Sequence, residues 1–161
     1  MHLGKVCPDK CISDDETFAD GITNGAEWYE VFGGMQDWNY MHSNCFEITL
    51  ELGCHKFPNE INLPNYWNDN KKPLLAYIQE VHKGIKGFVF DNKGKPVNNA
   101  TIKVEGIAHN VTSYTEGDYW RLLIAGTYNV TALKNGYKPQ TKTVITKSAS
   151  STNLNFTLQE I

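Results

Sequence analysis

A run of alternating residues between Asn44 and Cys54 holds the side chains best suited to acid–base chemistry. In "NCFEITLELGC" apolar and polar residues alternate, so the two-residue period of a strand places Glu47 and Glu51 together on one face. Glu51 comes at the end of this predicted strand, residues 45–52, and ligands of α/β sheets bind at that end of a strand. A carboxylate there can serve as a general base. The alternative is a solvated edge face on which both carboxylates point into water.

The longer string from Asp20 to Pro58 is more specific. It reads "DGITNGAEWYEVFGGMQDWNYMHSNCFEITLELGCHKFP" and resembles the zinc metallocarboxypeptidases of the regulatory (N/E) subfamily. The similarity continues through "LPNYWNDNKKPLLAYIQEVHKGIKGFVFDNKGKPVNNATIKVEGI" and "GDYWRLLIAGTYNVTALKNGY". It therefore covers nearly the whole chain, and only residues 1–18 and the last dozen match loosely.

The resemblance assigns roles to three residues. In that family a glutamate in the pattern Thr-x-Glu-Leu is the general base and acid beside a zinc-bound water, and Glu51 is the match. A tyrosine 22 residues earlier lies on a mobile loop that closes over the substrate, which points to Tyr29. Seven residues later, Gln36 matches a pocket-floor residue that helps accept a C-terminal Lys or Arg side chain. The implied enzyme acts on peptide or protein C-termini, with zinc lowering the pKa of its water to about 7.

The family's zinc ligands are not found in this sequence. They are His-x-x-Glu and a second His about a hundred residues later, and none of the histidines here has Glu three positions after it. The histidines are His2, His42, His55, His82 and His109. The family's carboxylate-binding arginine has no match either, since the only arginine is Arg121, far downstream in β-rich sequence. Because a catalytic zinc needs three protein ligands, we expect the zinc site in parts of a parent enzyme outside this chain, and no activity of the chain alone.

Composition excludes some classes of partner. With 15 basic and 18 acidic residues the net charge is −3, and the lysines are dispersed, so a nucleic-acid partner is not expected. No apolar run approaches the roughly 18 residues that span a bilayer, and "MHLGKVCPDK" lacks the apolar core of a signal peptide. Any membrane attachment is therefore expected only through regions outside this chain.

Four sequons in the second half of the chain indicate the secretory pathway. They are Asn99-Ala-Thr, Asn110-Val-Thr, Asn129-Val-Thr and Asn155-Phe-Thr. We predict these asparagines as glycosylation sites, in a protein that is extracellular or held in the trans-Golgi by a membrane anchor outside this chain.

The cysteines agree with an oxidising compartment. All of them, Cys7, Cys11, Cys45 and Cys54, fall in the first third, without the tight paired spacing of structural zinc sites. The resemblance implies a disulfide between Cys54 and either Cys7 or Cys11, of which we favour Cys7. Cys45 is then predicted to be a buried free thiol within the strand.

The first half of the chain is expected to be loop, strand and helix. Residues 1–18 are polar and predict a surface loop, and residues 20–44, rich in Gly, Asn and aromatics, predict a structured loop. After the strand, apolar residues at helical spacing predict one amphipathic helix that ends at Gly84. Asp69 is its expected N-cap, with Pro73 in the first turn.

From Ile85 onward the pattern becomes all-β. Seven segments, "IKGFVF", "ATIKVEG", "HNVTSY", "DYWRLLI", "TYNVTAL", "TKTVIT" and "TNLNFTL", alternate with turn strings. They predict a small sandwich, which resembles the transthyretin-like domain of the same subfamily. The expected architecture is an α/β segment of a truncated carboxypeptidase sheet, residues 1–83, followed by a seven-stranded transthyretin-like sandwich, residues 84–161. In the sandwich His109, Asp118 and Glu105 are expected to be isolated surface or turn residues.

The sequence is compatible with three functions. The first is the C-terminal segment of a secretory-pathway zinc carboxypeptidase that removes C-terminal Lys or Arg. The second is a non-catalytic fragment that acts as a β-sandwich binding or folding module. The third is a catalytically dead relative, against which the presence of Tyr29, Gln36 and Glu51 together argues.

Overall fold

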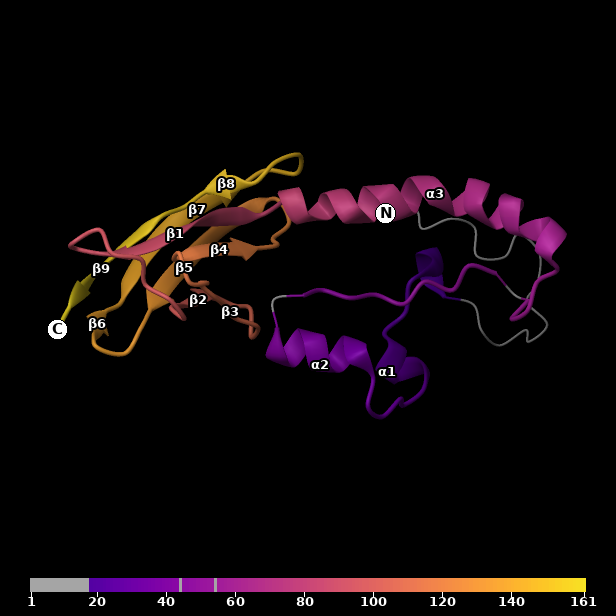
Figure 1. The fold of residues 1–161 in the computed structure, drawn as a ribbon, viewed down its shortest axis with the longest axis horizontal. Helices are drawn as coiled ribbons and strands as arrows, with labels where there is room; N and C mark the ends of the chain where they lie inside the picture. Colours follow the sequence, from indigo (N-terminus) through magenta and orange to yellow (C-terminus); the bar gives the residue numbers. More distant parts are fainter. Residues whose placement is uncertain (1–17, 44, 54) are drawn as a thin grey trace. The chain divides into compact units, whose positions relative to one another are not determined.

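The computed structural model describes residues 18–43, 45–53 and 55–161, which fall into two compact units (Figure 1). The first unit contains residues 18–37 and 47–79, and the second contains residues 38–46 and 80–161. Most of the loop predicted for residues 1–18 lies outside the described residues, as do Cys7, Cys11 and Cys54 of the predicted disulfide.

Helices are the only regular structure in the described residues before the sandwich. They are η1 (Ala19–Gly21), α1 (Gly25–Trp28), α2 (Met35–His42), η2 (Glu60–Asn62), α3 (Leu63–Gln79) and η3 (Glu80–His82). The prediction of an uninterrupted loop over residues 20–44 is therefore wrong, because α2 occupies eight of these residues. None of the helices in the described ranges is long and apolar enough to cross a membrane.

The strand predicted for residues 45–52 is not formed. The described residues of this stretch have no regular secondary structure. A strand is stabilised by hydrogen bonds to a neighbouring strand, and no described strand pairs with this segment. Without a sheet face to cover it, Cys45 is a free but exposed thiol, so the prediction that it is buried is also wrong.

The long helix α3 begins earlier than its pattern predicted. Asn59 caps the preceding turn, its Oδ1 accepting a hydrogen bond from the Ile61 N–H at 3.1 Å. Asp69 is therefore not an N-cap, and Pro73 lies in the helix interior, where it cannot donate to the carbonyl of residue 69. Gly84 ends the helical region with φ +83°, as its predicted role requires.

The second unit is a β-sandwich of two sheets. Its strands are β1 (Ile85–Asp91), β2 (Thr101–Val104), β3 (Val111–Thr112), β4 (Asp118–Arg121), β5 (Gly126–Leu133), β6 (Tyr137–Lys138), β7 (Gln140–Thr146), β8 (Thr152–Asn153) and β9 (Phe156–Glu160). One sheet has the order β4-β1-β9-β6 with β8 also on β1, and the other has the order β3-β2-β5-β7. Each predicted segment contains a strand. The described strands number nine rather than seven, since the last segment divides into β8 and β9 and the short β6 is added.

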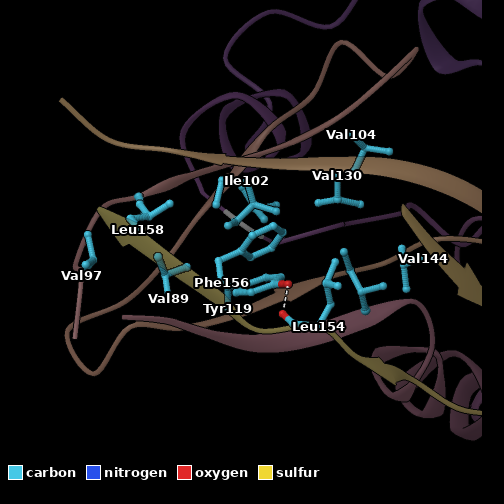
Figure 2. Close-up of a cluster of buried hydrophobic side chains, with 14 of the residues drawn as sticks. Val89, Val97, Ile102, Val104, Tyr119, Val130, Val144, Leu154, Phe156 and Leu158 are labelled. Atoms are coloured by element: carbon cyan, nitrogen blue, oxygen red, sulfur yellow. Dashed lines mark hydrogen bonds between the residues drawn. The ribbon is translucent and has the colours of Figure 1, made fainter. Parts of the chain in front are cut away.

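The hydrophobic core lies entirely between these two sheets (Figure 2). Inward positions alternate along each strand, as along β1 with its buried Ile85 and Val89. Tyr119 and Phe156, both fully buried, have ring centroids 6.2 Å apart at its centre. All buried hydrophobic residues of the described chain belong to residues 85–158, so the first unit has no comparable core of its own.

The break between β8 and β9 is bridged by side chains. At this point the Phe88 N–H donates to Asn155 Oδ1 at 2.9 Å, where a backbone carbonyl would ordinarily accept. The Leu154 carbonyl accepts instead from the Tyr119 hydroxyl, the hydrogen bond drawn in Figure 2. Two side chains thus satisfy backbone groups that the interrupted ladder leaves free.

Candidate functional site

Tyr29 directly follows the short helix α1. Asn24 begins that helix by accepting from the Ala26 N–H at 3.1 Å, and the Tyr29 N–H closes it on the Gly25 carbonyl at 3.0 Å. The Tyr29 ring lies edge-on to Trp28, with centroids 4.7 Å apart, and remains 55 % exposed. Its side chain therefore stands at the surface of a loop.

Gln36 lies in the first turn of α2. The helix follows Gly33, whose φ of +74° suits glycine, and Gly34. The Gln36 side chain is exposed. Its amide has no hydrogen-bond partner among the described residues.

Glu51 lies in the irregular segment, and its side chain is exposed. Among the described residues, no hydrogen bond or ion pair joins it to Tyr29 or Gln36. The three residues that the resemblance selected all belong to the first unit, and their arrangement around a ligand stays a prediction. Large apolar side chains of the same unit are also exposed, Phe32 and Phe57 each at 89 %.

The described residues do not fit a catalytic zinc. They contain no group of three His, Cys, Asp or Glu side chains close enough to hold a metal ion. Since three protein ligands are the minimum for such a site, no step of the chemistry can be assigned to zinc bound by the described part of this chain.

An aromatic cluster in the second unit was missed by the sequence analysis. His109 was expected to be isolated, but its ring stacks on Tyr40 of α2 with centroids 4.2 Å apart and planes at 22°. It also lies edge-on to Phe46 at 5.5 Å. The prediction failed because this contact joins residues far apart in sequence, which periodicity does not report.

Arg121 is the last member of this cluster. It is 4 % exposed, its Nη2 donates to the His109 carbonyl at 3.2 Å, and its guanidinium carbon lies 5.7 Å from the centroid of the Phe46 ring. Its Nε is buried without a hydrogen-bond partner. Burial lowers the pKa of Arg121, and burial together with the Arg121 charge lowers the pKa of His109. The inward position of Arg121, two residues after Tyr119 on β4, was the available sequence signal.

The four sequon asparagines are all exposed. Asn99 has a positive φ of 52° and precedes β2, and Asn110 precedes β3. Asn129 lies within β5, where its Nδ2 donates to Glu105 Oε2 at 2.8 Å and its Oδ1 accepts from Thr143. Asn155 lies at the break between β8 and β9.

Comparisons with known families match both halves of the chain. A model described as zinc carboxypeptidase matches residues 2–73, a range that includes Tyr29, Gln36 and Glu51. A model described as carboxypeptidase regulatory-like domain matches residues 84–159, the sandwich.

Similar proteins of known identity align with almost the whole chain. Carboxypeptidase D of Anas platyrhynchos is 54 % identical over 159 residues, which are 98 % of this chain and 11 % of that protein. The carboxypeptidase N catalytic chain of Rattus norvegicus is 49 % identical over 99 % of this chain and 33 % of its own length. The chain thus spans between about a tenth and a third of these relatives. Among solved structures, the Bacillus anthracis TIE protein has a TM-score of 0.43 at 22 % identity over 50 % of this chain and 17 % of that chain, too weak a similarity for a functional argument.

Proposed function

Because this chain belongs to the zinc carboxypeptidase family, joined to that family's regulatory-like domain, we propose that it forms the C-terminal part of a secretory-pathway metallocarboxypeptidase. The enzyme would remove C-terminal Lys or Arg from peptides and proteins. The observation that supports this best is the match of the carboxypeptidase model to the segment that carries Tyr29, Gln36 and Glu51. The zinc ligands of such an enzyme would lie outside the described residues.

The proposed chemistry assigns one role to each side chain. Glu51 takes a proton from the water that attacks the scissile carbonyl carbon, and returns it to the leaving amine. Tyr29 donates a hydrogen bond to the substrate from its exposed position after α1. Gln36 presents its amide to the basic side chain of the terminal residue. The exposure of all three supports this assignment, since each must reach a ligand rather than the interior of its own unit.

The described residues of the first unit form no buried core, which supports a role inside a larger domain. Its exposed apolar side chains include Phe32, Phe57 and Trp67. Apolar surface of this kind is buried against a partner in stable folds. The sandwich has its own core, so the alternative function, a non-catalytic binding or folding module, is favoured for residues 84–161 on their own.

The experiment is a comparison of variants in a longer protein that contains this chain and the family's zinc-binding motif. Glu51→Gln should lower the rate of Lys or Arg release by about 10²–10⁴-fold, the usual contribution of a general acid or base, while bound zinc is retained. Glu47→Gln, a carboxylate four residues upstream, is the control and should keep the wild-type rate. A Glu51→Gln enzyme with a tenth of the wild-type rate or more would contradict the assignment.

Two further variants separate binding from catalysis. Gln36→Leu should weaken Lys and Arg substrates by about 1–3 kcal/mol, the cost of leaving the polar end of the bound substrate side chain buried without a partner, with less effect on a neutral C-terminus. Tyr29→Phe should mainly raise KM. Equal effects of Gln36→Leu on basic and neutral substrates would rule out its role in side-chain selection.

A further inference from the structure

The outer face of the five-stranded sheet carries an exposed aromatic groove. Phe88 on β1 is 43 % exposed, and Trp120 on β4 is 51 % exposed. The groove has a volume of about 320 Å³, and its lining includes Lys86, Phe88, Asp118, Trp120, Asn153 and Asn155. Exposed aromatic surface within a hollow usually marks a site that something covers.

Strand register explains how these side chains come together. Lys86 pairs with Trp120 on one side and with Asn153 on the other, so the three form a row across the sheet. Phe88 pairs with Asp118 in the next row. Residues two apart on a strand share a face, so both rows point outward and combine aromatic rings with a polar margin.

Asn155 lies on the rim of this groove in a fixed orientation. Its Oδ1 accepts from the Phe88 N–H at 2.9 Å, and its backbone carbonyl accepts from Lys142 Nζ at 2.7 Å. The structure gives its Nδ2 no hydrogen-bond partner among the described residues, in contrast to Nδ2 of Asn129, which donates to Glu105. The atom to which a sugar would be attached is thus unpaired among the described residues, on a side chain that lines the groove.

We propose that an N-linked glycan on Asn155 folds back over this groove and covers Phe88 and Trp120. The proposal rests on the secretory location in the proposed function, because the modification needs a lipid-linked oligosaccharide diphosphate as donor. In that transfer Asn155 Nδ2 loses a proton and forms a bond to the anomeric carbon of the sugar, whose bond to the diphosphate oxygen breaks. The Oδ1 atom keeps its hydrogen bond to Phe88.

The chemistry of the groove suits a sugar in two respects. The C–H face of a pyranose ring is apolar and can cover exposed aromatic carbon, which favours contact in water. Lys86, Asp118 and Asn153 lie at the margin of the groove, and their polar groups can form hydrogen bonds with the hydroxyl and N-acetyl groups of a sugar. The attached glycan needs no separate binding step, since its attachment gives it a high local concentration at the groove.

The test uses the 161-residue chain directed into the secretory pathway of a glycosylating host. Thr157→Ser keeps the sequon and Thr157→Ala removes it, while neither changes the backbone N–H that donates to Gln140 Oε1. Glycans are trimmed to the first sugar, and occupancy of Asn155 is measured by mass spectrometry. The same two variants made in a host without N-glycosylation report the effect of the substitution itself.

We expect Asn155 to be occupied, and the indole resonance of Trp120 to shift only in the glycosylated Thr157→Ser protein. The melting temperature of that protein should exceed that of Thr157→Ala by roughly 4 °C, the scale of one modest contact in a domain of this size. Trp120→Ala should remove this difference. The two variants made without glycans should melt together.

Three outcomes would overturn the proposal. If Asn110, an exposed sequon before β3, is occupied and Asn155 is not, the host has glycosylated the chain and the groove assignment fails. If Asn155 is occupied but the glycan changes neither the Trp120 indole resonance nor the melting temperature, the glycan points into solvent and does not cover the groove. If no sequon is occupied, Asn155 does not act as an acceptor and the proposal fails. Carboxypeptidase activity is measured separately with the Glu51 variants, so none of these results bears on it.

Discussion

Removing the Tyr119 hydroxyl tests how the sandwich tolerates the break between β8 and β9. Tyr119 is fully buried, and its hydroxyl donates to the Leu154 carbonyl. The neighbouring Phe88 N–H is already taken by Asn155, so Tyr119→Phe leaves that carbonyl without its donor. The ring and its packing against Phe156 are kept, so the variant isolates one hydrogen bond.

The expected cost is that of leaving one buried polar group unsatisfied, about 1–3 kcal/mol. In a domain of 60–100 residues this lowers the melting temperature by roughly 4–8 °C for each kcal/mol. Burial also raises the pKa of Tyr119. Above about pH 10 the unfolded tyrosine ionises while the folded one stays protonated, so wild-type stability falls as pH rises. The Tyr119→Phe variant lacks this contribution, and the gap between the two proteins should narrow in that range.

Urea unfolding followed by circular dichroism measures both effects. Tyr128→Phe is the matched control, because its hydroxyl donates to the Ile124 carbonyl at 3.2 Å in a solvent-exposed setting. We expect it to change the free energy of unfolding by less than about 0.5 kcal/mol. Equal unfolding midpoints for the two variants at pH 7 would refute the argument that the buried carbonyl depends on Tyr119.

Three other predictions follow from the same structure. Gly117→Ala should destabilise the sandwich by about 2–5 kcal/mol, from its positive φ and a clash, because a Cβ there would lie 2.4 Å from the Val89 carbonyl oxygen. Gly94 has a similar φ of +80°, but an added Cβ there would meet open space, so Gly94→Ala should lower the free energy of unfolding by only about 1–2 kcal/mol in thermal melts. Equal losses of stability in the two variants would exclude the clash at Gly117. Since the pKa of His109 is lowered, unfolded His109 binds a proton more readily, and stability should decline as pH falls below about 6.5. His109→Phe keeps an aromatic ring on Tyr40 and should reduce the dependence of the free energy of unfolding on pH between pH 5 and 7. An unchanged pH dependence would mean that other groups cause it. Finally, the purified chain should hold far less than one zinc per molecule after dialysis; metal analysis that finds one tightly bound zinc would reverse this expectation.

The sandwich was largely predictable because its signals are local. Alternation along residues 127–133 reports which side chains face a core, and β5 (Gly126–Leu133) follows it closely. The positions of β6 and of the break before Phe156 were not predictable in the same way. They depend on which strand lies beside them, a property of the folded pair rather than of either segment.

The first half was less predictable for the same physical reason. Residues 45–52 have the alternation of a strand, but alternation alone cannot supply the neighbouring strand that a ladder requires. The resemblance selected Tyr29, Gln36 and Glu51 by type and spacing, and their arrangement around a ligand stays a prediction. The contact between Tyr40 and His109 had no signal in sequence, because nothing local to either residue requires the other.

The contacts of Tyr40 and Phe46 with His109 bear on the order in which the chain folds as it is synthesised. Phe46 is synthesised 75 residues before Arg121, the last member of its cluster. At about 5–20 residues per second, roughly 4–15 s pass between the synthesis of Phe46 and that of Arg121, and until then the surface that covers the two aromatic side chains is incomplete. During that interval they are apolar groups on a nascent chain, accessible to chaperones. The sandwich therefore packs against a segment that is synthesised long before its first strand. This contact forms only after a delay, which would not arise for a sandwich synthesised from residue 84 alone.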